Sequence, residues 1–305
     1  MLKKMPKPII VPSENGFDSR CSYNPAVIRE GSTYVMLYRG ESEDGLTGRI
    51  GLALSSDGVS FVKHPLPVLE PELGCEIMGV EDPRIVKIGK DYLMTYTGYD
   101  GKIARLCLAI SRNLLSWGKV GAIFDEFPGN YLRPKNWTKS GAILPEKVSG
   151  EYVMYFGDSN VWIAYSDDGL NWEYEREPVM KPRKGKFDSL LVEPGSPPVK
   201  VGDSIVLIYN SADENLVYRP GIAVFDADDP SRLVWRSEKP IMEPEYEWEV
   251  KGKVDNVIFV EGLVDLGEKV LLYYGAADKY VGLAIWEGTL RELIEKAGGG
   301  DVIQG

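Results

Sequence analysis

Carboxylates, rather than histidines or thiols, are the side chains through which this sequence could carry out acid–base chemistry. His64 is the only histidine, and it lies in the turn-like stretch Lys63-His64-Pro65-Leu66-Pro67. Histidine-based triads and histidine-rich metal centres are therefore nearly excluded. The three cysteines are an odd number without CxxC spacing, which argues against a disulfide framework or a zinc site. We expect no metal and no cofactor.

Polar residues stand directly before short apolar runs at several points along the chain, or directly after them. Each one alone would fit an ordinary solvated turn. Their recurrence at equivalent points of successive segments is harder to explain in that way. Those before a run are Asn24, Glu81-Asp82, Lys139-Ser140, Glu193 and Asp255-Asn256, Glu261 follows a run, and Arg39, Asp158, Asn210 and Asp278 end neighbouring runs.

The segments between these residues form an internal repeat. Each repeat has an apolar run, a glycine turn, a run ending in aromatics, and then a Ser-x-Asp-Gly-type turn before a final aromatic residue in the clearest copies. The repeats are marked by Tyr34, Tyr92, Tyr152, Ser204 and Lys269, at steps of 58, 60, 52 and 65 residues. Each unit has the three or four strands that one propeller blade needs.

The sequence therefore predicts an all-β protein, a five-bladed β-propeller, as a single domain over residues 1–305. The expected blades span approximately residues 24–61, 82–117, 139–172, 193–235 and 255–286. Thr289 begins a short C-terminal helix that ends at Gly298 and is expected to close the ring from outside. A β-sandwich is the alternative fold, but it would not produce the repeated turn signature.

Inner propeller strands run along a central channel, so residues at their beginnings point to one axial pocket. Two carboxylates across such a pocket, without histidine, suit glycoside cleavage: one protonates the leaving oxygen and the other activates water or attacks the sugar. The 32 aromatic residues include several near the expected mouth, where rings could pack on sugar C–H surfaces.

Several motifs, in the same order, resemble glycoside hydrolase family 130, which contains β-mannoside phosphorylases and β-1,2-mannosidases on a five-bladed propeller. The resemblance runs from about Asn24 to Trp286. The motifs are Glu81-Asp82-Pro83-Arg84-Ile-Val, Phe187-Asp188-Ser189, Gly195-Ser196-Pro197-Pro198, Tyr218-Arg219-Pro220-Gly221 and Tyr273-Tyr274-Gly275-Ala-Ala-Asp278.

The resemblance implies roles for individual residues. Asp82 of the Asp-Pro-Arg motif would be the general acid of an inverting reaction, with the proton passed through a hydroxyl of the mannosyl unit. Asn24 and Arg39 would hold the sugar at the cleavage subsite, and Asp278 would bind substrate. We expect the remaining substrate-binding residues to be Glu81, Arg84, Lys139, Arg219, Asn256 and Glu261.

Two departures from the family pattern favour water as the nucleophile. Family phosphorylases typically carry a Lys and an Arg that bind phosphate; Leu191 stands where the Lys would be, and Asp158 where the Arg would contribute. Removing two cations beside Glu193 would make phosphate costly to bind. The expectation is an inverting glycosidase that acts on β-mannosides, with β-1,2-linked manno-oligosaccharides as the expected substrates, Glu193 as base and Asp158 assisting.

Two alternatives remain open. The first is a β-mannoside phosphorylase that releases mannose 1-phosphate, with inorganic phosphate as co-substrate held by Lys139, Arg39 and either Arg133 or Lys135. The second is a non-catalytic sugar-binding propeller, which would have no reason to keep both Asp82 and Glu193. A retaining or arabinan-cleaving propeller enzyme lacks the motif match.

The composition limits the possible partners. The 305 residues carry a net charge of −11 without a basic run, which argues against nucleic acid. No apolar stretch approaches a membrane span, and the N-terminus has no apolar signal region, so we expect a cytoplasmic protein. The expected partner is a manno-oligosaccharide substrate, and an oligomer is possible.

Overall fold

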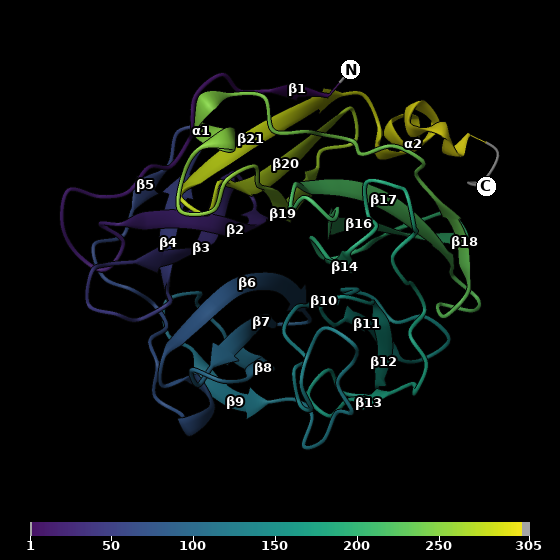
Figure 1. Cartoon of the computed structure of the whole chain (residues 1–305), viewed down its shortest axis with the longest axis horizontal. Coiled ribbons are helices and arrows are strands. Elements are labelled where there is room, and N and C mark those ends of the chain that lie inside the picture. The colour runs from purple at the N-terminus through teal and green to yellow at the C-terminus, as the bar shows by residue number, and fades with distance from the viewer. Residues whose placement is uncertain (1, 301–305) are drawn as a thin grey trace.

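Short strands joined by tight turns form five antiparallel sheets around a central axis in the computed structural model, which describes residues 2–300 (Figure 1). This arrangement confirms the predicted five-bladed propeller. Helical structure is confined to η1 (Gly74–Glu76), α1 (Glu247–Val250), α2 (Leu290–Ile294) and η2 (Glu295–Gly299) in the described residues.

The five sheets follow one another along the chain. Blade 1 contains β2 (Cys21–Glu30), β3 (Thr33–Glu41), β4 (Arg49–Ser55) and β5 (Val62–Lys63). Blade 2 contains β6 (Gly79–Ile88), β7 (Asp91–Tyr99), β8 (Ala104–Ser111) and β9 (Gly118–Ala122). Blade 3 contains β10 (Gly141–Ile143), β11 (Tyr152–Phe156), β12 (Trp162–Ser166) and β13 (Glu173–Tyr174).

The last two blades depart slightly from this plan. Blade 4 contains β14 (Leu191–Pro194), β15 (Val199–Val201), β16 (Ser204–Ala212), β17 (Tyr218–Asp226) and β18 (Leu233–Arg236), and both β14 and β15 pair with β16. Blade 5 contains β19 (Ile258–Asp265), β20 (Lys269–Ala276), β21 (Tyr280–Glu287) and, from the other end of the chain, β1 (Lys3–Lys4).

The repeated Ser-x-Asp-Gly sequence folds into the same turn in blades 1 and 3. In blade 1, Asp57 Oδ1 accepts hydrogen bonds from the backbone N–H groups of Val59 and Ser60, at 2.8 and 2.7 Å. Gly58 adopts φ +74°, which side-chain-bearing residues rarely do. The carboxylate satisfies backbone donors that have no strand partner, so the turn ends one strand and starts the next.

Apolar side chains fill the interfaces between neighbouring blades. Alternate residues of a strand point to opposite faces of its sheet, so each blade supplies two interfaces. On β3, Leu37 belongs to the cluster shared with blade 2, whereas Met36 and Tyr38 belong to the cluster shared with blade 5. Five such clusters, one at each junction, make up the core.

The N-terminal strand β1 closes the ring, which corrects the expectation that the C-terminal helix would do so. Lys3 and Lys4 pair with Ile285 and Ala284 of β21, so the two ends of the chain share blade 5 (Figure 1). The edge of β21 has free backbone hydrogen-bonding groups, which another strand can pair with. A helix cannot do so, because its backbone groups bond within the helix. The helix α2 is capped by Thr289, as predicted, and packs Leu293 on the blade 4–blade 5 cluster.

Lys4 fixes this closure through a buried ion pair. Its Nζ lies 2.7 Å from Glu249 Oε2, and Glu249 also accepts a hydrogen bond from Tyr274 Oη at 2.7 Å. Replacing Lys4 with Met would leave the buried Glu249 carboxylate without its cation. We expect Lys4→Met to lower the free energy of unfolding by about 3 kcal/mol in chemical denaturation.

Lys3→Met provides the matched control, because Lys3 belongs to the same short strand and is exposed. It should change stability by no more than about 0.5 kcal/mol. Equal losses in the two variants would contradict the assignment of the closure to the Lys4–Glu249 pair.

Candidate active site

Bulges in the inner strands aim polar side chains at the channel. The register of β2 shifts around Asn24, that of β6 around Asp82, and that of β19 around Glu261. Asn24 and Asp82 adopt φ of +49° and +50°, so the strain coincides with the residues that the sequence singled out. The sequence placed Asn24 and Asp82 before their strands and Glu261 after its strand. All three lie inside strands, because a bulge turns a side chain without ending the strand.

A cavity of about 120 Å³ lies on the channel axis, where the five blades meet. It brings together six of the residues predicted from the sequence. The complete lining is Asn24, Arg39, Asp82, Lys139, Glu193, Tyr218, Val254, Val257, Phe259 and Asp278. Sequence reasoning missed Tyr218, Val254, Val257 and Phe259. Of these, Tyr218 belongs to a motif that the sequence had marked, where Arg219 was selected instead.

Lys139 lies between two acids of this pocket. Its Nζ is 3.6 Å from Asp82 Oδ2 and 3.5 Å from Glu193 Oε2, so these two oxygens are no more than about 7 Å apart. Ser140 Oγ donates to Glu193 Oε2 at 2.7 Å. Burial lowers the pKa of Lys139, but Glu193 and Asp82 outweigh it and hold that pKa above its usual range. The pocket therefore contains a permanently charged ammonium group.

Asp82 is held in its ionised form. Burial raises its pKa, but Arg39, Lys139 and Asn24 outweigh burial, and the pKa lies well below the usual range. Arg39 Nη1 lies 3.1 Å from Asp82 Oδ1, and Asn24 Nδ2 donates to the same oxygen at 2.8 Å. A general acid must carry a proton, so the unliganded pocket holds Asp82 in the wrong state for acid catalysis.

The other pocket carboxyls are shifted in the opposite direction. Burial raises the pKa of Glu193, although Lys139 opposes it. Burial likewise raises the pKa of Asp278 to about 6, against the effect of Arg39. Glu81 lies beside the pocket, with Oε1 3.2 Å from Arg39 Nη2, and burial raises its pKa. These three groups prefer the neutral form more than free carboxyls do.

Asp158 does not line the pocket, but its negative charge, together with burial, contributes to raising the pKa of Glu193. Arg133 Nε donates to its Oδ2 at 2.7 Å and Arg133 Nη2 to its Oδ1 at 3.2 Å. Trp137 Nε1 donates to Oδ2 at 2.9 Å. The sequence alone suggests that Asp158 is an uncompensated acid. In the structure its carboxylate is paired with the bidentate guanidinium of Arg133, from the segment Arg133-Pro134.

Arg84 lies beneath the pocket rather than in it. Its Nε donates to Gly195 O at 2.7 Å and its Nη2 to Pro194 O at 2.8 Å, and both carbonyls directly follow Glu193. Its Nη1 donates to Asp82 O at 3.2 Å. Glu261 Oε1 lies 3.0 Å from Nη2, and both side chains are almost completely buried. Arg84 thus ties the backbones that carry Asp82 and Glu193, with Glu261 as its counter-ion, and neither side chain lines the substrate pocket as expected.

Two further predicted residues lie outside the cavity lining. Arg219 Nη1 donates to Asp213 Oδ2 at 2.8 Å, so its charge is used at the rim of blade 4. Asn256 accepts a hydrogen bond from Tyr218 N through its backbone oxygen at 2.9 Å. Asn256 therefore helps to position Tyr218, a pocket residue, through the main chain.

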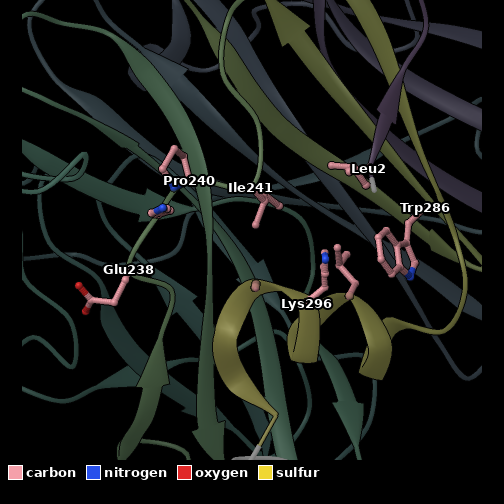
Figure 2. Close-up of a pocket in the computed structure, with 9 residues that line it drawn as sticks. Leu2, Glu238, Pro240, Ile241, Trp286 and Lys296 are labelled. Carbon is pink, nitrogen blue, oxygen red and sulfur yellow. The ribbon is translucent and has the colours of Figure 1, made fainter.

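A larger cavity of about 390 Å³ lies away from the axis, against α2 and η2 (Figure 2). Leu2, Ile241, Trp286 and Leu293 give it mainly apolar walls, and it holds no pair of carboxylates. Acid–base chemistry requires facing titratable groups, so the smaller axial pocket is the candidate active site.

Within residues 2–300, no group of three or more His, Cys, Asp or Glu side chains is arranged to hold a metal ion. No helix in the same range has the length and hydropathy to cross a bilayer.

A propeller whose axial pocket sets buried carboxylates against an ammonium and a guanidinium has the features of a carbohydrate-cleaving enzyme. The sequence model of the family Glyco_hydro_130, described as β-1,4-mannooligosaccharide phosphorylase, matches residues 4–296. The chain belongs to glycoside hydrolase family 130, as the motifs had indicated.

Individual relatives are similar over nearly their whole length. A 1,2-β-oligomannan phosphorylase of Thermoanaerobacter sp. (strain X514) is 38% identical, over 92% of this chain and 95% of the relative. A β-1,2-mannobiose phosphorylase of the same strain is also 38% identical, with the same coverage. A solved structure is 34% identical with a TM-score of 0.87, covering 94% of both chains; its description says that the family's mannoside phosphorylases include hydrolases of β-1,2-mannosidic linkages in Candida mannan.

These relatives correct the expectation of a hydrolytic glycosidase. The two curated relatives at 38% identity are both named phosphorylases, so the prediction that water is the nucleophile is wrong. The error has a physical origin. Asp158 is an unpaired negative charge when only the sequence is considered, whereas Arg133 neutralises it in the structure.

The Arg84–Glu261 pair should be detectable in stability measurements. Burial raises the pKa of Glu261 well above its usual range even though Arg84 opposes the shift. In Arg84→Met, Glu261 must stay protonated in the fold but ionises in the unfolded chain, so stability should fall as pH rises. We expect a loss of about 3–5 kcal/mol at pH 8 and a smaller loss at pH 5, measured by chemical denaturation.

The double variant Arg84→Met/Glu261→Gln is the control. Without the ionisable carboxyl, the extra loss at pH 8 should disappear and the effects of the two substitutions should not add. Simple additivity would mean that the two side chains do not act as a pair.

Proposed function

We propose that this protein is an inverting β-1,2-mannoside phosphorylase. It would transfer the terminal mannosyl unit of a β-1,2-linked manno-oligosaccharide to inorganic phosphate, giving α-mannose 1-phosphate and a shortened acceptor. The names of the relatives support both phosphorolysis and the β-1,2 linkage. The observation that carries the proposal is the ammonium group of Lys139, partly exposed in the pocket between Asp82 and Glu193.

Phosphate would bind between a cation of the pocket lining and a cation of the neighbouring loop. Lys139 acts as a point charge, and Arg133, whose side chain remains 30% exposed, offers its guanidinium from the adjoining loop. Glu193 would oppose a dianion if it were ionised. Because burial raises its pKa, its neutral form can instead donate a hydrogen bond to a phosphate oxygen.

The bond changes assign a role to each group. A phosphate oxygen forms a bond to the anomeric carbon from the face opposite the leaving group, and the glycosidic bond breaks. Asp82 supplies the proton that the leaving oxygen needs, while Asn24, Arg39 and Asp278 hold the mannosyl unit. Most of the catalysis is then positioning and electrostatic stabilisation of the attacking anion.

Phosphate binding would change the protonation of Asp82, which is ionised when Lys139 compensates its charge. Lys139 lowers the pKa of Asp82 less when its ammonium group also binds another anion. A bound phosphate draws on the charge of Lys139 and adds negative charge nearby, and both effects raise the pKa of Asp82. Asp82 would therefore be protonated more readily in the phosphate complex, although Arg39 and Asn24 continue to lower its pKa.

The direct test is the product mixture from β-1,2-mannobiose with and without inorganic phosphate. With phosphate we expect α-mannose 1-phosphate and free mannose in equal amounts, identified by NMR, and without phosphate no turnover. Asp82→Asn should lower turnover by a factor of about 10² to 10⁴ and controls for contaminating activity. Release of two free mannose molecules at the same rate without phosphate would overturn the proposal.

Proton linkage gives a second, independent measurement. Titrating phosphate into the enzyme at pH 7, in two buffers of different ionisation enthalpy, should reveal proton uptake. Asp82→Asn should reduce that uptake, because the group whose pKa rises on phosphate binding is Asp82. Since uptake is favoured at low pH, phosphate affinity should weaken with rising pH more steeply in the wild type than in the variant. Identical uptake in both proteins would assign the proton to another group.

A further inference from the structure

The segment between β9 and β10, residues 123–140, forms an ordered loop beside the pocket. Phe127 is buried in the blade 2–blade 3 cluster, with its ring centroid 5.1 Å from that of Trp162. Asn136 closes the loop on itself: its N–H donates to Phe127 O at 2.8 Å and its Oδ1 accepts from Phe127 N at 2.9 Å. The loop therefore has a fixed base.

Asp158 fixes the middle of the same loop. Besides the bonds from Arg133 and Trp137, Asn130 Nδ2 donates to the backbone oxygen of Asp158 at 3.2 Å. Asn130 Oδ1 in turn accepts from the N–H groups of Leu132 and Arg133, at 2.9 and 3.2 Å. These contacts hold both residues that flank Tyr131.

Tyr131, at the tip of the loop, is tethered although it is largely exposed. Its hydroxyl donates to Leu190 O at 3.0 Å, directly before the strand that carries Glu193. The residue nevertheless remains 67% exposed, and the neighbouring Leu132 is 38% exposed. This hydrogen bond ties the loop between blades 2 and 3 to the segment that enters blade 4. It orders a large apolar surface without burying it, which stability alone does not require.

The axial cavity is too small for a sugar chain, so an oligosaccharide that places its terminal unit there must continue across the rim. Tyr131 is two residues along the chain from Arg133, whose pKa is raised, against the effect of burial, in part by the charge of the pocket residue Glu193. The Tyr131 hydroxyl bonds to Leu190, three residues before Glu193. Aromatic rings offer apolar faces to the C–H faces of sugars, and a neutral ligand gains little from the charges nearby.

We propose that Tyr131 is a platform for a mannosyl unit beyond the cleaved linkage, and that it makes the enzyme prefer chains of three or more sugars to the disaccharide. The inference rests on the proposed function, since it names the longer substrate of the same site. Asp158 acts here as a positioning residue, which holds the loop rather than touching sugar.

The test compares β-1,2-mannotriose with β-1,2-mannobiose in Tyr131→Ala. The ratio of kcat/KM for the trisaccharide to that for the disaccharide should fall about tenfold, mainly through KM. Tyr131→Phe keeps the ring and loses only the tether, so its ratio should stay within about threefold of the wild type. Leu115→Ala, at a 52% exposed residue on the outer turn of blade 2, is the matched surface control and should leave the ratio unchanged.

Calorimetric binding of β-1,2-mannotriose without phosphate separates this inference from the proposed function. Weaker binding in Tyr131→Ala than in the wild type supports the platform even if no phosphorolysis is found. An unchanged ratio, or equal losses in the Ala and Phe variants, overturns the platform and leaves phosphorolysis standing.

Discussion

Charge concentrated at the centre of the ring is the constraint on which the rest of this structure depends. Acids from different blades converge on one axis, and ionised groups removed from water must be compensated or neutralised. Arg84 compensates Glu261 beneath the pocket, Arg39 and Lys139 compensate Asp82 within it, and Arg133 compensates Asp158 beside it. Each cation is supplied by a different segment from its acid, so the ion pairs also fix the blades relative to one another.

Lys139 is important for both the stability of the pocket and the proposed reaction. Its ammonium group lies between the carboxyl groups of Asp82 and Glu193, and it is the group that an anionic co-substrate would bind. Under the proposed function, binding of phosphate would change the protonation of these acids. The protonation state needed for catalysis would then arise only in the complex with phosphate.

The scaffold separates rigid parts from variable ones. Backbone ladders and interface clusters hold the sheets, while bulges in β2 and β6 turn Asn24 and Asp82 towards the axis. Loops over the mouth have another role, because they are free to differ without disturbing the blades. The loop that carries Tyr131 is held by Asp158 and Asn136, which gives a surface segment the order that a binding surface needs.

The sequence by itself determined the five repeats, the alternation that buries one face of each strand against the next blade, and the acids at equivalent points of successive units. These follow from local periodicity and turn chemistry, which neighbouring residues encode. Tertiary structure alone decided that β1 closes the ring, that Arg84 lies under the pocket, and that Arg133 pairs with Asp158. Those pairings join residues from 25 to more than 250 positions apart. The spacing of residues along the chain does not predict which charged side chains come into contact in a propeller. The nucleophile was misjudged for that reason, since electrostatic cost depends on distances between blades and not on the order of residues along the chain.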